Sequence, residues 1–274
     1  MGKRPKLAPE RIFDRPHYRV FNQARTILLR KCLGEWKVQL EIETAWDIGC
    51  GLGSFSTLLM ELGFQTRALD GREDNAAEAG RRNPGLFVRV ADVEDPALVE
   101  FGASDLVLCF GLLYHLENPF RAIRNLRQLT GKILVIESVC TNDKDLKLLL
   151  VDEKPHEDQG LRHVAFYPSE SCLIKMLYLA GFPQVYGFTC LPDHPDFCPP
   201  KGGRRVRTML AATQVQLSLP FLTPVPEPFG HDEPWAGLPA HSVHSAGRIR
   251  NFATKPWSEK AATMRRLLGL QKEG

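Results

Sequence analysis

Alternating glycines are the first feature of this chain that could do chemistry. Residues 44–56 read as a short apolar strand, a turn carrying Gly49, Gly51 and Gly53, and the first turn of a helix. Glycine has no side chain, so the backbone of this turn can pass close to a ligand. The helix that follows offers unpaired N–H groups to the same ligand. The pattern predicts a nucleoside site.

The acids around this turn narrow the choice of nucleoside. Asp70 closes the next apolar run, where a carboxylate in doubly wound folds accepts the hydroxyl groups of a ribose. A dinucleotide fingerprint would place its third glycine at position 54, which is Ser54 here. Asp47 would repel a pyrophosphate, whereas it can pair with the amino end, or with a bridging water, of a nucleoside that carries an amino acid. We therefore expect an amino-acid-bearing nucleoside.

The run D-x-G-x-G-x-G from Asp47 resembles motif I of the class I S-adenosylmethionine-dependent methyltransferases. Four further segments follow in the family's order, at residues 66–72, 86–93, 104–119 and 132–138, so that the resemblance spans roughly residues 40–212. It implies that the protein is an enzyme, a transferase that uses S-adenosyl-L-methionine. The cofactor-binding residues that the resemblance implies are Asp47, Gly49, Gly51, Gly53, Asp70, Gly71, Asp92, Val93 and Phe110.

The loop after the fourth predicted strand carries the candidate catalytic residues. A sulfonium donor is already activated, so alignment of the reactants supplies much of the acceleration. A general base is needed only for an acceptor that is protonated at neutral pH. His115 is the candidate base, or else it hydrogen-bonds the backbone and stabilises the loop. Tyr114 either contacts the methionine end or the acceptor, or packs. Glu137, at the tip of the fifth strand, is expected to be a solvated carboxylate, with orientation of an acceptor as the alternative.

Two segments, residues 110–119 and 162–169, are similar to stretches of the tRNA wobble-uridine carboxymethyltransferases, which use a carboxylated S-adenosylmethionine. In that family a tyrosine matching Tyr114 and an arginine near the last strand contact the extra carboxylate. The region before residue 44 offers only Trp36 and Lys37 in place of that family's upstream segment, so plain methyl transfer is the prediction. The arginines that could match are Arg204, Arg205 and Arg207.

Two remaining polar clusters predict no further chemistry. Cys190, His194 and Cys198 lack the C-x-x-C pair that is usual in zinc sites, so no metal is expected. A basic cluster lies near the last predicted strand, and we expect it to be the charged face of a solvated edge strand. Binding of a phosphate or carboxylate is the alternative. The members of this basic cluster are Lys201, Arg204, Arg205 and Arg207.

These residues must be positioned by alternating strands and helices. The alternation predicts an α/β, Rossmann-like fold: a doubly wound, seven-stranded, mostly parallel sheet of the class I methyltransferase type. Residues 141–160 read as a polar insertion with an apolar centre. Helices are predicted over residues 17–36, 55–62, 73–81 and 120–129, and after an N-cap at Ser169, and two final strands over residues 184–190 and 205–213 should form an antiparallel hairpin.

The 274 residues divide by composition into three parts. Residues 1–40 are a basic arm and a cap helix, residues 41–213 the S-adenosylmethionine-binding domain, and residues 214–274 a proline-rich tail with a short helix over residues 258–269. Seven scattered cysteines favour a reducing compartment, and we expect a cytoplasmic protein without a secretory signal or membrane span. The balance of 35 basic and 32 acidic residues gives no sign of a large nucleic-acid surface.

We therefore predict a methyltransferase that methylates an oxygen or nitrogen of a small molecule. One alternative is RNA modification of the tRNA wobble-uridine carboxymethyltransferase type, so RNA stays possible as a partner. The other is a methyltransferase fold without activity that serves as a binding protein. Oligomeric state and acceptor cannot be derived from these residues.

Overall fold

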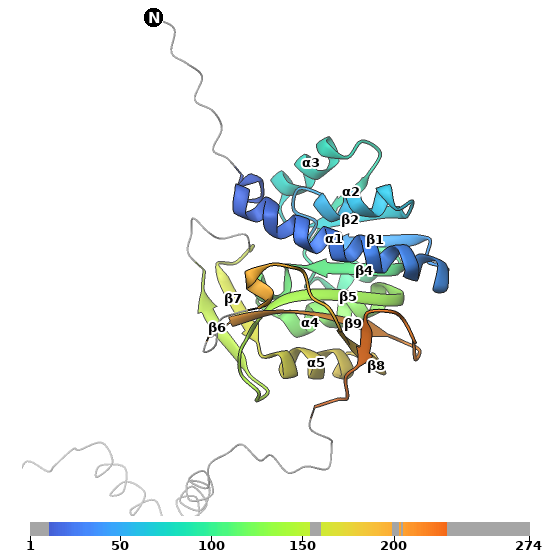
Figure 1. Cartoon of the computed structure of the whole chain (residues 1–274). Helices are drawn as coiled ribbons and strands as arrows, with labels where there is room; N and C mark the ends of the chain where they lie inside the picture. The colour runs from blue at the N-terminus through green and yellow to red at the C-terminus, as the bar shows by residue number, and fades with distance from the viewer. Residues whose placement is uncertain (1–10, 154–159, 199–202, 204, 229–274) are drawn as a thin grey trace, which may run out of the picture. The chain divides into compact units, whose positions relative to one another are not determined.

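The computed structural model describes residues 11–153, 160–198, 203 and 205–228 (Figure 1). The α-helices are α1 (Pro16–Gln39), α2 (Ser54–Glu61), α3 (Glu73–Arg82), α4 (Pro119–Leu129) and α5 (Glu170–Leu179), and four short 3₁₀ helices are η1 (Ile12–Asp14), η2 (Pro96–Phe101), η3 (Leu113–His115) and η4 (Pro195–Phe197). The strands are β1 (Thr44–Ile48), β2 (Gln65–Asp70), β3 (Phe87–Val90), β4 (Ser104–Phe110), β5 (Thr130–Thr141), β6 (Leu148–Asp152), β7 (Val164–Pro168), β8 (Gln184–Phe188), β9 (Arg205–Thr213) and β10 (Leu222–Pro224).

The main sheet has eight strands in the order β10-β8-β9-β5-β4-β1-β2-β3. Its five strands from β5 to β3 run parallel, and β9 runs antiparallel to both β5 and β8. The doubly wound α/β fold and the antiparallel hairpin are therefore confirmed. The sheet has one strand more than the seven predicted, because β10 pairs with the outer side of β8. Proline is tolerated there because β10 is an edge strand.

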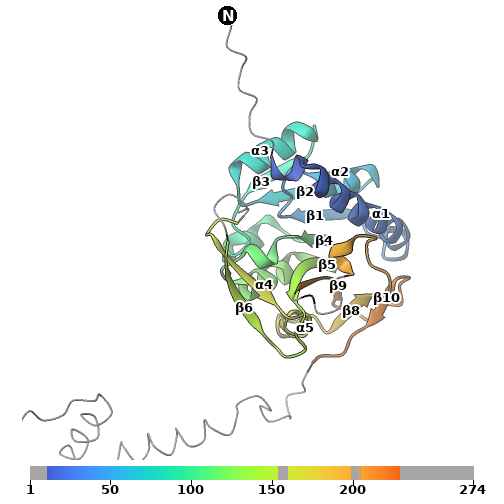
Figure 2. The ribbon, with the colours of Figure 1, turned by 60° about the vertical axis from the view of Figure 1, so that its left-hand side comes forward.

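Alternating side chains of the strands build two cores, one on each face of the sheet. In β4, Leu106 and Leu108 pack in the core that α1 and α2 cover, whereas Val107 and Cys109 pack in the core that α4 and α5 cover. Figure 2 shows α1 and α2 on one side of the strands and α4 and α5 on the other. This layering leaves the carboxyl ends of the parallel strands open for a ligand.

The predicted helices are present, with small differences at their ends. The helix predicted from residue 17 is α1, and α5 begins where predicted, since the Ser169 side chain accepts a hydrogen bond from the Cys172 N–H. The helix predicted over residues 258–269 lies outside the described residues. The described residues, all of which come before residue 229, cluster as one compact unit. Within the described part of the chain, no helix combines the length and the apolar character needed to cross a bilayer.

The insertion at residues 141–160 contains a strand that the sequence analysis missed. β6 pairs antiparallel with β7 in a separate two-stranded sheet. Three of its side chains, Leu148, Leu149 and Leu150, are exposed. Three consecutive exposed leucines follow neither the helical nor the strand period, so the pattern gave no element here. This hairpin matters because its far end reaches the site described next.

Candidate functional site

A cavity opens at the carboxyl ends of the parallel strands. Its empty space, with open solvent at the mouth included, is about 970 Å³. Its walls come from the turns after β1, β2, β3 and β4, from η1 and α1, and from residues 160–162 at the end of the β6–β7 hairpin. This is where doubly wound sheets bind nucleotides. Of the predicted cofactor residues, those that line it are Gly49, Gly51, Asp70, Gly71, Asp92, Val93 and Phe110.

The glycine turn has the backbone conformation that glycine favours. Gly49, Gly51 and Gly53 have φ values of 74°, 54° and 82°, in the left-handed region. Gly53 does not line the cavity; a Cβ there would lie 2.6 Å from the Asn83 side-chain amide and 3.3 Å from Ala79 Cβ. Gly49 and Gly51 therefore shape the cavity, whereas Gly53 lets α2 start against α3.

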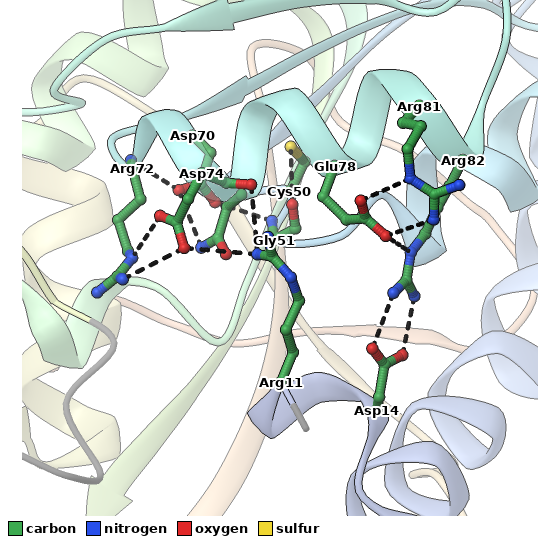
Figure 3. Close-up of polar contacts among 11 residues, drawn as sticks. Arg11, Asp14, Cys50, Gly51, Asp70, Arg72, Asp74, Glu78, Arg81 and Arg82 are labelled. Carbon is green, nitrogen blue, oxygen red and sulfur yellow. Dashed lines mark hydrogen bonds and ion pairs between the residues drawn. The ribbon is translucent and has the colours of Figure 1, made fainter. Parts of the chain in front are cut away.

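Asp70 is tied to the glycine turn. Its carboxylate accepts hydrogen bonds from the Gly51 N–H at 2.8 Å and the Arg72 N–H at 2.9 Å (Figure 3). Burial raises the pKa of Asp70, and the two amides partly offset that effect. An ionised carboxylate has about four acceptor positions. Asp70 thus keeps acceptor capacity toward the cavity while it fixes the turn.

Asp47 lies beneath the turn and does not line the cavity. It is 1% exposed and accepts a hydrogen bond from the Ser56 hydroxyl at 2.6 Å. Burial raises the pKa of Asp47 to about 6. Its direct role here is to hold the first turn of α2 to the end of β1.

Asp92 lines the cavity beside Val93, and its carboxylate is already paired. Arg162, from the hairpin end, donates to it at 2.7 Å. Next to this pair, a Cβ on Gly71 would lie 2.8 Å from the Leu161 side chain. The hairpin end therefore packs on the part of the cavity between β2 and β3.

Two ion pairs hold η1 and the residue before it against α3. Arg11 contacts Asp74 at 3.4 Å, and Asp14 accepts from Arg82 at 2.8 Å (Figure 3). These pairs hold Phe13 in the cavity wall, where its ring lies 3.3 Å from the position a Gly51 Cβ would take. The chain segment before α1 thus closes part of the site.

A buried ionic cluster flanks the cavity beyond Gly111. Glu137 is fully buried and accepts from Arg25 and from Arg207, each at 2.7 Å. Arg207 also contacts the Tyr114 hydroxyl at 3.3 Å. The prediction of Glu137 as a solvated carboxylate is therefore wrong. Its partners, Arg25 and Arg207, are 112 and 70 residues away in the sequence, so no local sequence pattern could predict them.

The charges of this cluster shift each other's pKa values. Burial alone would raise the pKa of Glu137, but Arg207 and Arg25 outweigh it and hold that pKa below its usual value. Burial lowers the pKa of Arg25, and Glu137 offsets part of the effect. Arg25 also lies over the Phe21 ring, with its guanidinium carbon 4.0 Å from the ring centre. Arg25 lines the cavity, and its buried Nε has no hydrogen-bond partner among the described residues.

The basic cluster is not the charged face of an edge strand. β9 lies inside the sheet between β5 and β8, and the Arg207 side chain is largely buried. Arg205 stacks on Tyr167, with its guanidinium carbon 4.6 Å from the ring centre. Lys201 and Arg204 lie outside the described residues. Of the two described arginines, Arg207 is buried beside Glu137, whereas Arg205 is exposed and covers the Tyr167 ring.

The two candidate catalytic residues differ in position. His115 lines the cavity, and its Nδ1 contacts the Glu153 carboxylate rather than backbone. Tyr114 does not line it; it is buried next to Arg207, and burial raises its pKa. Among the described residues no group of three or more His, Cys, Asp or Glu side chains is arranged for a metal ion.

Several cavity residues were not singled out from the sequence. Phe13 lies in η1, within the segment read as a basic arm, and Tyr18, Asn22 and Arg25 lie in α1, where the sequence showed only a helical period. An arginine on the otherwise apolar face of that period was the available signal, since such a face rarely buries a charge without a partner.

Residues 46–132 match a protein family described as "Methyltransferase domain". A tRNA U34 carboxymethyltransferase of Trichodesmium erythraeum (strain IMS101) is 33% identical over 89 residues, 32% of this chain and 27% of the relative. A ubiquinone biosynthesis O-methyltransferase of Caulobacter vibrioides (strain ATCC 19089 / CIP 103742 / CB 15) is 30% identical over 143 residues, 47% of this chain and 56% of the relative. The chain thus spans about a quarter to just over half the length of these relatives.

Solved structures share the fold. The N-terminal domain of EvdMO1 with SAH bound superimposes with a TM-score of 0.56 at 19% identity, covering 71% of this chain and 80% of that chain. The sugar N-methyltransferase KedS8 from Streptoalloteichus sp ATCC 53650 gives a TM-score of 0.54 at 16% identity, covering 79% and 98%. At such identities the likeness is one of fold alone.

Proposed function

Because residues 46–132 place this chain in the class I S-adenosylmethionine-dependent methyltransferase family, we propose that it methylates an oxygen or nitrogen of a small-molecule acceptor. S-adenosylmethionine supplies the activated methyl group when it is bound. The ubiquinone biosynthesis O-methyltransferase among the relatives supports a small-molecule acceptor.

The cavity residues fit such a cofactor at both ends. Asp70 would hold the ribose hydroxyls, with Gly71, Asp92 and Val93 beside the adenine. Gly49 and Gly51 would let the backbone approach the amino-acid moiety. Asp47 and Gly53 would act from below by fixing this turn, and Phe110 would pack beside the methionine part.

The observation that carries the proposal is the buried Nε of Arg25, which lies in the cavity wall without a hydrogen-bond partner among the described residues. Arg25 also shares its buried carboxylate, Glu137, with Arg207, whose other carboxylate partner is the exposed Asp196 at 3.6 Å. An unpaired buried donor is costly, so it favours an anionic partner. The α-carboxylate of S-adenosylmethionine is such an anion. The chain's own contribution is then to hold the donor in line with the acceptor and to exclude water.

Asp70→Ala tests the cofactor site. We expect the affinity for S-adenosylhomocysteine, measured by calorimetry, to fall at least about tenfold, since two hydroxyl hydrogen bonds to a charged acceptor are lost. Asp145→Ala, at an exposed aspartate that does not line the cavity, is the matched control. Circular dichroism checks that both variants fold. Unchanged affinity in folded Asp70→Ala would reject the ribose assignment.

The second candidate function is use of a carboxylated S-adenosylmethionine. In its favour, Arg207 contacts the Tyr114 hydroxyl, so the tyrosine and an arginine expected to face the extra carboxylate lie together, although neither lines the cavity. The local similarity to a tRNA U34 carboxymethyltransferase points the same way. Mass spectrometry of the copurified nucleoside distinguishes the two, since the carboxylated form is heavier by one carboxyl group.

A further inference from the structure

A histidine and a glutamate from distant parts of the chain meet at the wall of the cavity. His115 ends η3, after β4, and Glu153 follows β6 in the inserted hairpin, 38 residues later. The Nδ1 of His115 contacts the Glu153 carboxylate, and the two side chains are only 11% and 9% exposed. The Glu153 N–H donates to the His163 carbonyl at 3.3 Å, which fixes the glutamate on its hairpin.

This contact sets which nitrogen of the histidine carries the proton. An ionised carboxylate only accepts hydrogen bonds, so Nδ1 must be the donor. In a neutral imidazole the lone pair then lies on Nε2. Nε2 is buried and has no hydrogen-bond partner within the described part of the chain. His115 lines the cavity, and its basic nitrogen is buried there with no described group occupying it.

Other ionisable side chains of the cavity are less suited to accept a proton. Asp92 is paired with Arg162, and Asp70 accepts from two backbone amides. Glu94 accepts from the Asn118 N–H at 2.9 Å. The cavity arginines hold their protons at any working pH. The remaining lining residues that ionise are Tyr18, Cys50 and Glu117: a weak acid, a thiol whose pKa burial raises, and an exposed carboxylate.

We propose that His115 is the general base for a hydroxyl acceptor, and that Glu153 is its positioning residue. The inference rests on the proposed methyltransferase function and narrows its substrate class. As the bond from the acceptor oxygen to the methyl carbon forms, the carbon–sulfur bond breaks and its electron pair stays on sulfur. The hydroxyl proton passes to Nε2, and the Nδ1–H bond to Glu153 stabilises the resulting imidazolium.

Amine and hydroxyl acceptors differ in whether they need a general base, and this difference indicates the acceptor class. A neutral amine has a free lone pair and can attack without a base, whereas a hydroxyl must lose its proton during the transfer. The buried His115–Glu153 pair orients one imidazole nitrogen and is therefore suited to a hydroxyl acceptor. The hairpin packs tightly on η3, since a Cβ on Gly160 would lie 2.9 Å from the His115 carbonyl oxygen. The insertion after β5 therefore builds part of the catalytic site.

The tautomer is a direct test that needs no acceptor. Nitrogen-15 NMR of the histidine side chains, assigned with His115→Gln, is recorded on the full chain at neutral pH with and without S-adenosylhomocysteine. We expect Nδ1 protonated and Nε2 bare, and loss of this preference in Glu153→Ala. A proton on Nε2 alone, or a doubly protonated ring, would overturn the proposal.

Kinetics test the role in transfer. Release of S-adenosylhomocysteine is measured with a panel of dihydric phenols, hydroxybenzoates and hexoses, against matched anilines and amino sugars. His115→Ala should lose about 10²–10⁴-fold in kcat on hydroxyl compounds, with the KM for S-adenosylmethionine within about threefold, and added imidazole should restore part of the rate. Glu153→Gln should lose about 10-fold or more, and Asp152→Asn, the exposed neighbour, should behave as wild type.

The outcomes separate this inference from the proposed function. Turnover of amines only, or equal rates in wild type and His115→Ala, would refute the base while leaving methyl transfer in place. If wild-type protein fails to bind S-adenosylhomocysteine in calorimetry, the proposed function falls, whereas the tautomer in the free protein still decides the His115–Glu153 pair. Calorimetry on each variant verifies that it is folded.

Discussion

Glu137 carries the negative charge between two buried guanidiniums, and this makes it decisive for stability as well as for the site. Both of its oxygens are used, one by Arg25 and one by Arg207. A buried ion pair adds little net stability, but removal of one partner leaves a charge without compensation. In this cluster, removal of Glu137 would leave Arg25 without a carboxylate among the described residues and Arg207 with only the exposed Asp196 at 3.6 Å.

Glu137→Gln should therefore lower the free energy of unfolding by roughly 3–5 kcal/mol. Chemical denaturation measures it, and Glu61→Gln, at an exposed pair with Arg30, should change it by less than about 1 kcal/mol. The folded-state pKa of Glu137 is depressed, so its contribution is present above the ordinary carboxyl pKa and is lost as the pH falls through the folded value. The variant should lack this acid-side loss. A cost as small as that of Glu61→Gln would contradict the buried charge balance.

The pKa of Asp47 is shifted in the opposite direction to that of Glu137. Its pKa is raised by burial from 3.8 to about 6, so the folded state holds the proton more tightly than the unfolded state. Its contribution to stability is present below 3.8 and is lost as the pH rises through about 6. Asp47→Asn keeps an acceptor for Ser56 and should remove this loss. Denaturation curves of both proteins across this pH range should diverge; parallel curves would rule the effect out.

At the scale of residues, the side chains that line the cavity were predicted from the sequence better than the side chains that hold them in place. Glycines and strand-end acids lie in one continuous pattern, and seven of the nine predicted cofactor residues line the cavity. Arg25 and Glu153 act through partners far away in the sequence, and only the folded chain brings them together. The expectation that His115 bonds to backbone failed for the same reason.

At the scale of elements, the turn between β1 and α2 must fit between the cavity and α3. Gly53 begins α2 with φ at 82°, against the Asn83 side chain and Ala79. A side chain there meets both backbone strain and a neighbour that cannot move far. The packing of α2 on α3 thus depends on a position that does not line the cavity.

Gly53→Ala should cost roughly 1–3 kcal/mol of unfolding free energy and weaken binding of S-adenosylhomocysteine. Gly34→Ala is the matched control, because Gly34 lies within α1 and an added Cβ meets nothing within 4 Å. That change should stabilise the protein by about 0.5–1 kcal/mol. Thermal melts and calorimetry compare them, and equal effects of the two substitutions would refute the packing argument.

Periodicity predicted the elements with a clear period and missed the others. α1 to α4 have one apolar face, and β4 and β5 are continuous apolar runs, so each was found within a few residues. β6 has no period because its leucines are exposed, and β10 is only three residues long. Both are defined by their partner strand, which is a property of the tertiary fold.

At the scale of the whole molecule, residues 214–228 fasten the outer strand of the sheet to helices on both faces. β10 covers the edge of β8. The Val225 N–H also donates to the Val185 carbonyl at 2.9 Å. Side-chain hydrogen bonds join this segment to α1, β8 and α5: Trp36 to the Pro220 carbonyl, Leu217 N–H to the Tyr186 hydroxyl, and Tyr178 to the Val225 carbonyl.

A chain ending at residue 213 should therefore be less stable than one ending at residue 228. The shorter chain loses these bonds, and at about 1 kcal/mol each the difference should reach roughly 2–5 kcal/mol. It also exposes the edge of β8, and an uncovered edge strand promotes association of sheets. Denaturation compares the stability of the two chains and light scattering their association. If both unfold at the same denaturant concentration and stay monodisperse alike, β10 contributes nothing to the sheet, and the sheet is in effect the seven-stranded one.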